Sequence, residues 1–289
     1  MKLPDNIELP FFAYGLFKKG QLGYLRIRRY IAKHLEASVN GELYIRDGLP
    51  ILKESDSSQV RGDTFYFRDG SNAYQRIIEL EPEHQYRWSV VELDPADSRI
   101  KLNILLGKSP DKGSVKIKFE NSRDWDGRED SLFKDALEVV KEAIDADFHL
   151  NFPQSVKGFF RYQMAYMLLW SSIERYASLR YHLGKDVWQK IRKIAEEPEF
   201  GASLSEIAQT HRSIQRADEP GKKVHLDPSN PRKSLEYYYQ VRSNMVHRGK
   251  SAIEDFKTVK TSLSELYEIF MRVKEAAFFE ASLSFDEEG

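Results

Sequence analysis

The sequence contains no cysteine. That absence excludes disulfides, thiolate zinc sites, iron–sulfur clusters and cysteine nucleophiles. Net charge is nearly absent too, because 44 Lys and Arg residues stand against 45 Asp and Glu residues, so nucleic-acid binding would need a local basic patch. The most apolar stretch, 164–170, is far shorter than the roughly 20 residues that span a bilayer. Because the N-terminal residues also lack the apolar run of a secretory signal, we expect a cytoplasmic protein with no membrane partner.

Aromatic and charged residues are both plentiful. The chain has 17 Phe, 15 Tyr and 4 Trp, and 31% of its residues are charged, a composition that favours folded domains over disorder. A length of 289 residues suggests two domains at roughly 100–200 residues each. We expect these domains to cover 1–125 and 126–289.

The first 120 residues alternate short apolar runs with turn residues. This pattern predicts an α+β domain built on a mixed sheet. Strands are expected at 9–14, 40–44, 59–67, 87–93 and 115–119, and helices at 21–36 and 71–81.

From about residue 130 the hydrophobic period becomes helical, which predicts an all-α bundle. Helices are expected at 130–146, along a long aromatic stretch around Trp170, and at 186–195, 204–214, 233–247 and 253–279, with loops at 197–203 and 217–232. The sequence leaves open which of the two domains owns the helix at 130–146.

A series of short motifs runs through the first domain. An apolar strand enters a glycine-bounded turn at Tyr14, Gly15 and Leu16. It is followed by Gly41-Glu42-Leu43-Tyr44, Gly48-Leu49-Pro50-Ile51-Leu52, Val60-Arg61-Gly62-Asp63-Thr64-Phe65-Tyr66, Ile77-Ile78-Glu79-Leu80-Glu81 and Tyr86-Arg87. This order resembles the gamma-glutamylcyclotransferase-like family over about residues 11–93. The resemblance implies a small mixed β-barrel with a cavity.

The same resemblance implies roles for individual residues. Tyr14, Gly15 and Leu16 would form the loop that binds a gamma-glutamyl group, Tyr86 would be a further substrate-binding residue, and Glu81 would be the general base. Glu81 would take a proton from the α-amine, which attacks the γ-carbonyl and releases 5-oxoproline. A carboxylate can do this only where burial raises its pKa towards the working pH.

Three positions depart from the family pattern. Leu16 stands where the family has Thr, Ile78 where it has Asp, and Pro82 where it has Gly. The alternative is that Glu81 is a solvated carboxylate at a helix end and that the pocket is inert or has another use.

A second pattern lies near the end of a helix in the C-terminal half. Arg242-Ser243-Asn244-Met245-Val246-His247 is followed by Arg248-Gly249 and a final long helix. An Arg-x4-His motif in this position resembles the HEPN superfamily, over about residues 155–280. Five residues of helix correspond to about 7.5 Å of rise and about 140° of rotation. Arg242 and His247 therefore do not share a helix face, and one copy of the chain offers a poor active site. The HEPN resemblance implies that two copies pair and bring two Arg and two His into one cleft.

The HEPN resemblance implies metal-independent RNA cleavage, in which the ribose 2′-OH attacks the adjacent phosphate. Arg242 would grip the phosphate, and His247, near a helix C-terminus, would transfer the proton. Ser243 or Asn244 would supply the polar group that usually follows the arginine. The alternative is that Arg242 pairs with an acidic neighbour such as Glu174, and that the domain only binds or dimerises.

These patterns lead to one leading function and two rivals. The leading prediction is a homodimeric HEPN-type endoribonuclease with RNA as its partner and no cofactor, in stress response or phage defence. Its N-terminal domain would bind a small gamma-glutamyl-like ligand. The rivals are a gamma-glutamylcyclotransferase and a non-catalytic, ligand-sensing dimerisation scaffold.

Overall fold

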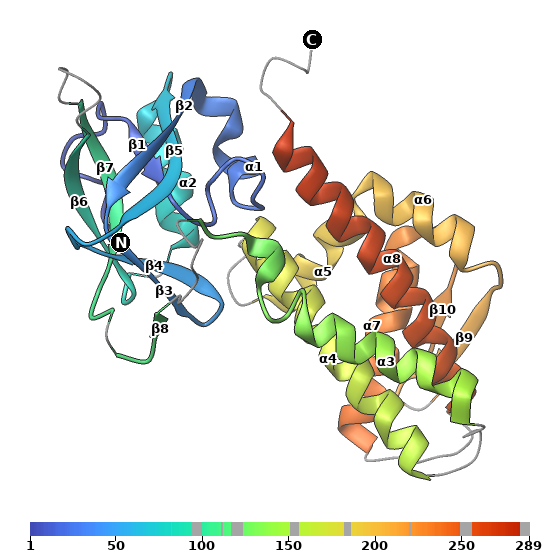
Figure 1. Cartoon of the computed structure of the whole chain (residues 1–289). Helices are drawn as coiled ribbons and strands as arrows, with labels where there is room; N and C mark the ends of the chain where they lie inside the picture. The colour runs from blue at the N-terminus through green and yellow to red at the C-terminus, as the bar shows by residue number, and fades with distance from the viewer. Residues whose placement is uncertain are drawn as a thin grey trace. The chain divides into compact units, whose positions relative to one another are not determined.

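Figure 1 shows the computed structural model of the chain. The structure describes residues 1–81, 83–93, 100–110, 112–116, 124–150, 156–181, 186–219, 221–248 and 256–283. The chain divides into two compact units. One consists of Met1–Asp130 with Ala277–Gly289, and the other of Ser131–Ala276.

Five strands of the first unit form one mixed sheet. They are β1 (Phe11–Ala13), β2 (Ile31–Asn40), β5 (Gln59–Phe67), β6 (Tyr86–Leu93) and β7 (Ile100–Gly107), in the order β2-β5-β1-β7-β6. β1 runs parallel to β7, whereas the other neighbours are antiparallel. β2 and β6 are therefore the two edges of an open sheet.

A smaller three-stranded sheet completes the β structure of this unit. β3 (Glu42–Arg46), β4 (Leu49–Lys53) and β8 (Val115–Lys116) follow the order β4-β3-β8. The turn between β3 and β4 has positive φ at Asp47 and Gly48, 51° and 75°. Asp-Gly is a preferred pair for such a two-residue hairpin turn.

The first unit also contains the short α1 (Tyr24–Ile27), the 3₁₀ turns Arg28–Tyr30 and Gly127–Glu129, and the longer α2 (Gly70–Leu80). α2 begins at Asp69, whose side chain accepts a hydrogen bond from the Asn72 amide at 3.0 Å, a favourable N-cap. The fully buried Tyr74 of α2 packs edge-on against Phe11 of β1 and Trp88 of β6. α2 thus covers one face of the large sheet (Figure 1), and its last residue leads directly into Glu81.

The second unit is mainly helical. Its helices are α3 (Asp135–Leu150), α4 (Val156–Tyr181), α5 (Val187–Ala195), α6 (Pro198–Ile207), α7 (Pro231–Arg248) and α8 (Phe256–Ser282), of which α8 ends in residues grouped with the first unit. Large aromatic side chains fill its core, among them Tyr166, Trp170, Tyr176, Tyr238 and Phe270. α3, whose place the sequence leaves open, belongs to this unit.

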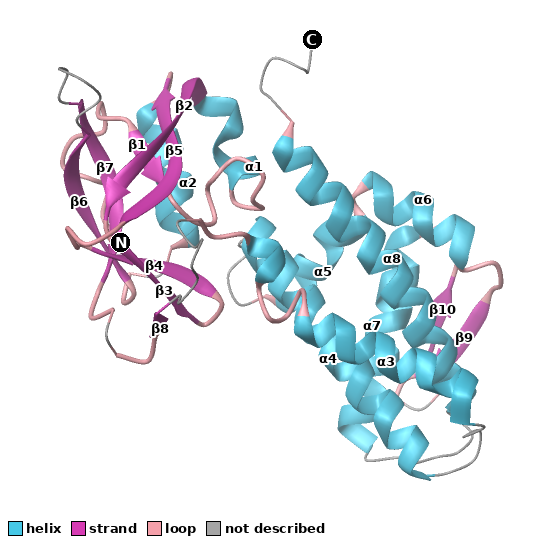
Figure 2. Ribbon diagram, viewed as in Figure 1, coloured by secondary structure: helices cyan, strands magenta, loops and turns pink. Residues whose placement is uncertain are grey.

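A β-hairpin interrupts these helices. β9 (Arg212–Gln215) pairs with β10 (Lys223–Leu226), and Figure 2 shows the two strands among the helices. The expectation of an all-helical domain is wrong here, as is that of a loop throughout 217–232.

The α+β class is confirmed, but several expected elements are wrong. The described strands form no closed barrel. The helix expected at 21–36 is only partly present: α1 and the 3₁₀ turn span 24–30, and β2 begins at Ile31. From there the chain pairs with β5, because tertiary pairing overrides helix propensity. The loop expected at 197–203 is the start of α6, where Pro198 occupies the first turn, a position that suits proline.

Two sequence features fall outside the described residues, namely Pro82 and Gly249. Among the described helices, none combines the length and the hydropathy of a membrane-spanning segment.

Candidate functional site

A small cavity in the first unit brings together the five residues that the sequence selects there. Tyr14, Gly15, Leu16, Glu81 and Tyr86 all line it. Its volume is about 20 Å³, which corresponds to the space for about one water molecule. The remaining lining residues are Phe11, Phe12, Ala13, Phe17, Leu49, Pro50 and Leu105.

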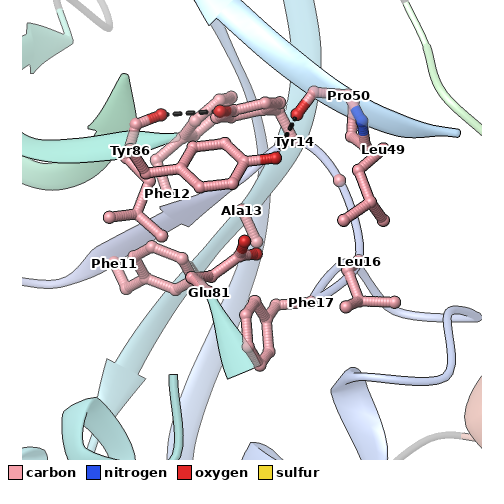
Figure 3. A pocket seen from close by; sticks show the side chains of 12 residues that line it. Phe11, Phe12, Ala13, Tyr14, Leu16, Phe17, Leu49, Pro50, Glu81 and Tyr86 are labelled. Carbon is pink, nitrogen blue, oxygen red and sulfur yellow. Dashed lines mark hydrogen bonds between the residues drawn. The ribbon is translucent and has the colours of Figure 1, made fainter. Parts of the chain in front are cut away.

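Glu81 is the one acidic group in this lining. The residue is 9% exposed, and Figure 3 shows its carboxyl group pointing toward the middle of the aromatic and aliphatic side chains. Its Oε2 atom has no hydrogen-bond partner among the described residues. Loss of hydration disfavours the charged form of a carboxyl, and this burial raises the pKa of Glu81 to about 8. The side chain is therefore poised to exchange a proton near neutral pH.

The two tyrosines of the cavity hold its walls together. The Tyr14 hydroxyl donates to the Leu105 carbonyl at 2.6 Å and accepts from the Leu52 amide at 3.3 Å. The Tyr86 hydroxyl donates to the Pro50 carbonyl at 2.9 Å. Burial, and then the nearby Glu81, raise the pKa of Tyr14. Tyr14 thus stays neutral and joins β4 to β7.

Gly15 is required by close packing. A Cβ atom at this position would lie 2.4 Å from Cγ of Pro50, so any larger residue would push β4 away from the turn. The turn closes through a hydrogen bond from the Lys18 amide to the Gly15 carbonyl at 2.9 Å. Leu16 is buried, and its carbonyl accepts from the Gly23 amide at 3.1 Å. These contacts shape the cavity that holds Glu81.

The second candidate site lies on α7 in the second unit. The guanidinium of Arg242 approaches a Glu174 oxygen of α4 at 4.0 Å and lies over the Tyr239 ring, 5.6 Å from its centroid. Its side chain is 25% exposed, and its Nε atom has no hydrogen-bond acceptor among the described residues. The ion pair is long, so Arg242 keeps unused donor capacity.

The other α7 residues have different surroundings. The Asn244 side chain donates to the Gln215 carbonyl at 2.8 Å and accepts from the Ala217 amide and the Gln240 side chain, each at 2.9 Å. It therefore fastens the end of β9 to α7. Ser243 is half-buried. His247 lies on the last turn of α7, and its side chain is outside the described part of the structure.

Sequence reasoning missed several cavity walls and one aromatic contact. Leu49 and Pro50 lie in the motif series of the first domain but have no expected role in the site, and both β4 and β7, which contains Leu105, are strands that the sequence pattern did not predict. On α7, Tyr239 packs between Trp170 and Trp188, with ring centroids 5.4 and 4.6 Å away. These contacts join helices that are far apart in sequence, so spacing along the chain could not predict them.

The comparisons with known proteins add no further assignment. The chain has no significant match among protein-family models, curated proteins or solved structures. Among the described residues, no three or more His, Asp or Glu side chains are placed to hold a metal ion. Function is therefore inferred from the side chains of the two candidate sites.

Proposed function

We propose that the first unit binds a gamma-glutamyl compound and that Glu81 acts on it as a general base, in a gamma-glutamylcyclotransferase-type reaction. The observation that carries this proposal is the buried carboxyl of Glu81, which has an Oε2 atom without a partner among the described residues and a pKa raised to about 8. A general base works best when its pKa lies near the operating pH. An ordinary surface glutamate would be too weak a base.

The reaction needs one proton to be moved twice. The carboxylate of Glu81 takes a proton from the substrate's α-amine as the nitrogen forms a bond to the γ-carbonyl carbon. The bond between that carbon and the leaving amine then breaks, and the same proton passes from Glu81 to the leaving nitrogen. The products are 5-oxoproline and a free amine, and Glu81 returns to its starting state.

The size of the cavity sets a condition on this function. A volume of about 20 Å³ holds about one water molecule, whereas a gamma-glutamyl group contains several times as many heavy atoms. Binding therefore requires the wall formed by Leu49 and Pro50, or the turn at Leu16, to move outward. The favourable contact between the α-amine of the ligand and the Glu81 carboxylate would contribute to this opening.

Release of 5-oxoproline from gamma-glutamyl amino acids and gamma-glutamyl amines tests the proposal. Glu81→Gln is expected to lower the rate at least about 100-fold, because a lost general base costs about that much. Glu83→Gln is the matched control, since the Glu83 side chain is 70% exposed, and it should retain activity. Wild-type protein that releases no 5-oxoproline would contradict the proposal. If such inactive protein were still stabilised by a gamma-glutamyl compound, the ligand-sensing alternative would replace it.

A second function is favoured by Arg242. Its long contact with Glu174 and its Nε without an acceptor among the described residues leave donors that could bind a phosphate. We propose, as the alternative, that two copies of the second unit pair so that Arg242 and His247 cleave RNA without a metal. The 2′-oxygen would bond to phosphorus while the P–O bond to the next nucleotide breaks. His247 would transfer the proton to the leaving oxygen.

Incubation with labelled RNA in the presence of a chelator tests this alternative. Wild-type protein should yield fragments ending in a 2′,3′-cyclic phosphate, and His247→Ala should lower the rate at least about 100-fold. His225→Ala, a change on β10, serves as the matched histidine control and should keep the activity. Equal cleavage by wild type and His247→Ala would contradict the proposed role of His247 in RNA cleavage. A protein that is monomeric in solution would contradict a site formed by two copies of the second unit.

A further inference from the structure

An exposed tryptophan lies on the surface of the second unit, against the helix that carries Arg242. Trp188 of α5 is 42% exposed, and its ring centroid lies 4.6 Å from that of Tyr239 on α7, at an interplanar angle of 57°. The buried Trp170 of α4 supports Tyr239 in turn, with ring centroids 5.4 Å apart. Three helices thus hold the Trp188 indole in place, while the part that Tyr239 does not cover is open to solvent.

Arg242 contacts the same Tyr239 ring. The centre of its guanidinium lies 5.6 Å from the ring centroid, so Trp188 and Arg242 are both neighbours of one aromatic side chain. The contact of Arg242 with Glu174 is 4.0 Å, which is longer than a hydrogen bond, and its Nε atom has no acceptor among the described residues. An open indole and a guanidinium with unused donors therefore lie beside each other.

The surface around Trp188 is basic. The sequence of α5 contains one Arg and two Lys residues and no acidic residue. Arg192 follows Trp188 by four residues, so the two side chains share a face of the helix, and Arg192 is exposed. Gln189 and Lys193 are exposed as well. The surroundings of the indole are therefore complementary to an anion rather than to an apolar partner.

An unpaired nucleotide combines the two chemistries that this surface offers. Every base has a flat face that stacks on an aromatic side chain, whatever the sequence. The phosphate attached to the nucleoside accepts parallel hydrogen bonds from a guanidinium. In a duplex the base faces are covered by their neighbours, so aromatic side chains bind single strands in preference.

We propose that Trp188 and Arg242 together bind one nucleotide of single-stranded RNA. The base stacks on the open part of the indole, its phosphate accepts from Arg242, and Arg192 meets a neighbouring phosphate. This inference rests on the alternative function proposed for the second unit and deepens it, because it names how the strand is held. Stacking reads no base edge, so the site has no strong sequence preference.

Fluorescence anisotropy with a labelled single-stranded 2′-O-methyl RNA tests the role of the indole. This strand lacks the attacking hydroxyl, so the assay measures binding apart from cleavage. Trp188→Ala should weaken binding at least about tenfold, because the stacked base loses its platform, whereas Trp188→Phe, which can still stack, should keep most of the affinity. Phe279→Ala, a change of a 65% exposed aromatic on α8, is the control and should bind as wild type does.

The salt dependence of the same titration tests the role of the arginine. Arg242→Gln should weaken binding and lower the slope of log affinity against log salt concentration by about 0.7, as expected for one lost phosphate contact to a single strand. Trp188→Ala should leave that slope unchanged. Arg232→Gln makes the same charge change at the start of α7, where the side chain is 60% exposed, and should alter neither quantity appreciably.

Three results would overturn the proposal. The first is equal affinity of wild type for the single strand and for a duplex of the same sequence, which would indicate charge attraction alone. The second is unchanged affinity of Trp188→Ala. The third is no binding by wild type together with loss of a dimer in Trp188→Ala, which would assign the indole to a protein interface. Binding of the 2′-O-methyl strand without cleavage of ordinary RNA would instead remove the reaction and keep this site.

Discussion

Glu81→Gln is expected to raise the melting temperature of the protein at pH 9 and to leave it nearly unchanged at pH 5. Burial raises the pKa of Glu81 from 4.5 to about 8, so the folded protein holds this proton where the unfolded chain has released it. Stability from this group is therefore fully present below about pH 4.5 and falls as the pH rises towards 8. The difference in unfolding free energy corresponds to on the order of 5 kcal/mol. Glutamine at position 81 stays neutral over this pH range, so the variant does not lose this unfolding free energy.

Thermal unfolding followed by circular dichroism from pH 5 to pH 9 measures the effect. At about 2–4 °C per kcal/mol for a chain of this size, the wild-type curve should fall well below that of Glu81→Gln at the alkaline end. Glu83→Gln should stay close to the wild-type curve, because Glu83 is exposed and its pair with the N-terminal ammonium, at 3.2 Å, is of the surface kind that contributes little to stability. Parallel curves for wild type and Glu81→Gln would show that the carboxyl is hydrated, and general-base catalysis by Glu81 would lose its physical basis.

Local signals predicted much of the fold. The strand expected at 59–67 is β5 itself, and the helix expected at 71–81 matches α2 closely, because clear turn residues bound both. β2 was missed because Ala32, Lys33, Leu35 and Glu36 favour a helix in isolation. Its pairing with β5 could not be inferred from spacing, since strand pairing depends on tertiary contacts.

For the candidate sites too, the sequence predicted which residues come together but not their tertiary contacts. The order of the motifs placed Tyr14, Glu81 and Tyr86 in one cavity, and the structure brings them together. The sequence could not predict that the Tyr14 and Tyr86 hydroxyls donate hydrogen bonds to main-chain carbonyls. Nor could it predict that the volume of the cavity is so small. In the second unit the sequence named Glu174 as a partner for Arg242, and the structure places them 4.0 Å apart.

One buried carboxylate contacts three side chains in the C-terminal turns of α4. Glu197 is 10% exposed on its side chain. It accepts hydrogen bonds from the Tyr176 hydroxyl at 2.8 and 2.9 Å and from the Tyr181 hydroxyl. Arg180 lies 3.5 Å from it. Three side chains of α4 thus converge on the residue that precedes α6.

Glu197→Ala is expected to lower the free energy of unfolding by about 3–5 kcal/mol, because it removes the carboxylate opposite the buried Arg180 cation and an acceptor of two tyrosine hydroxyls. Urea denaturation measures the loss, and near-ultraviolet circular dichroism should report altered tyrosine packing in the folded variant. Glu196→Ala is the neighbouring control: Glu196 is 60% exposed and pairs only with Lys193 in the described structure, so its loss should cost less than about 1 kcal/mol. Equal losses of unfolding free energy for Glu197→Ala and Glu196→Ala would mean that the contacts of Glu197 with α4 do not stabilise the fold. Glu197→Gln keeps one acceptor oxygen but no charge, so it should fall between the two if the charge on Arg180 sets most of the cost.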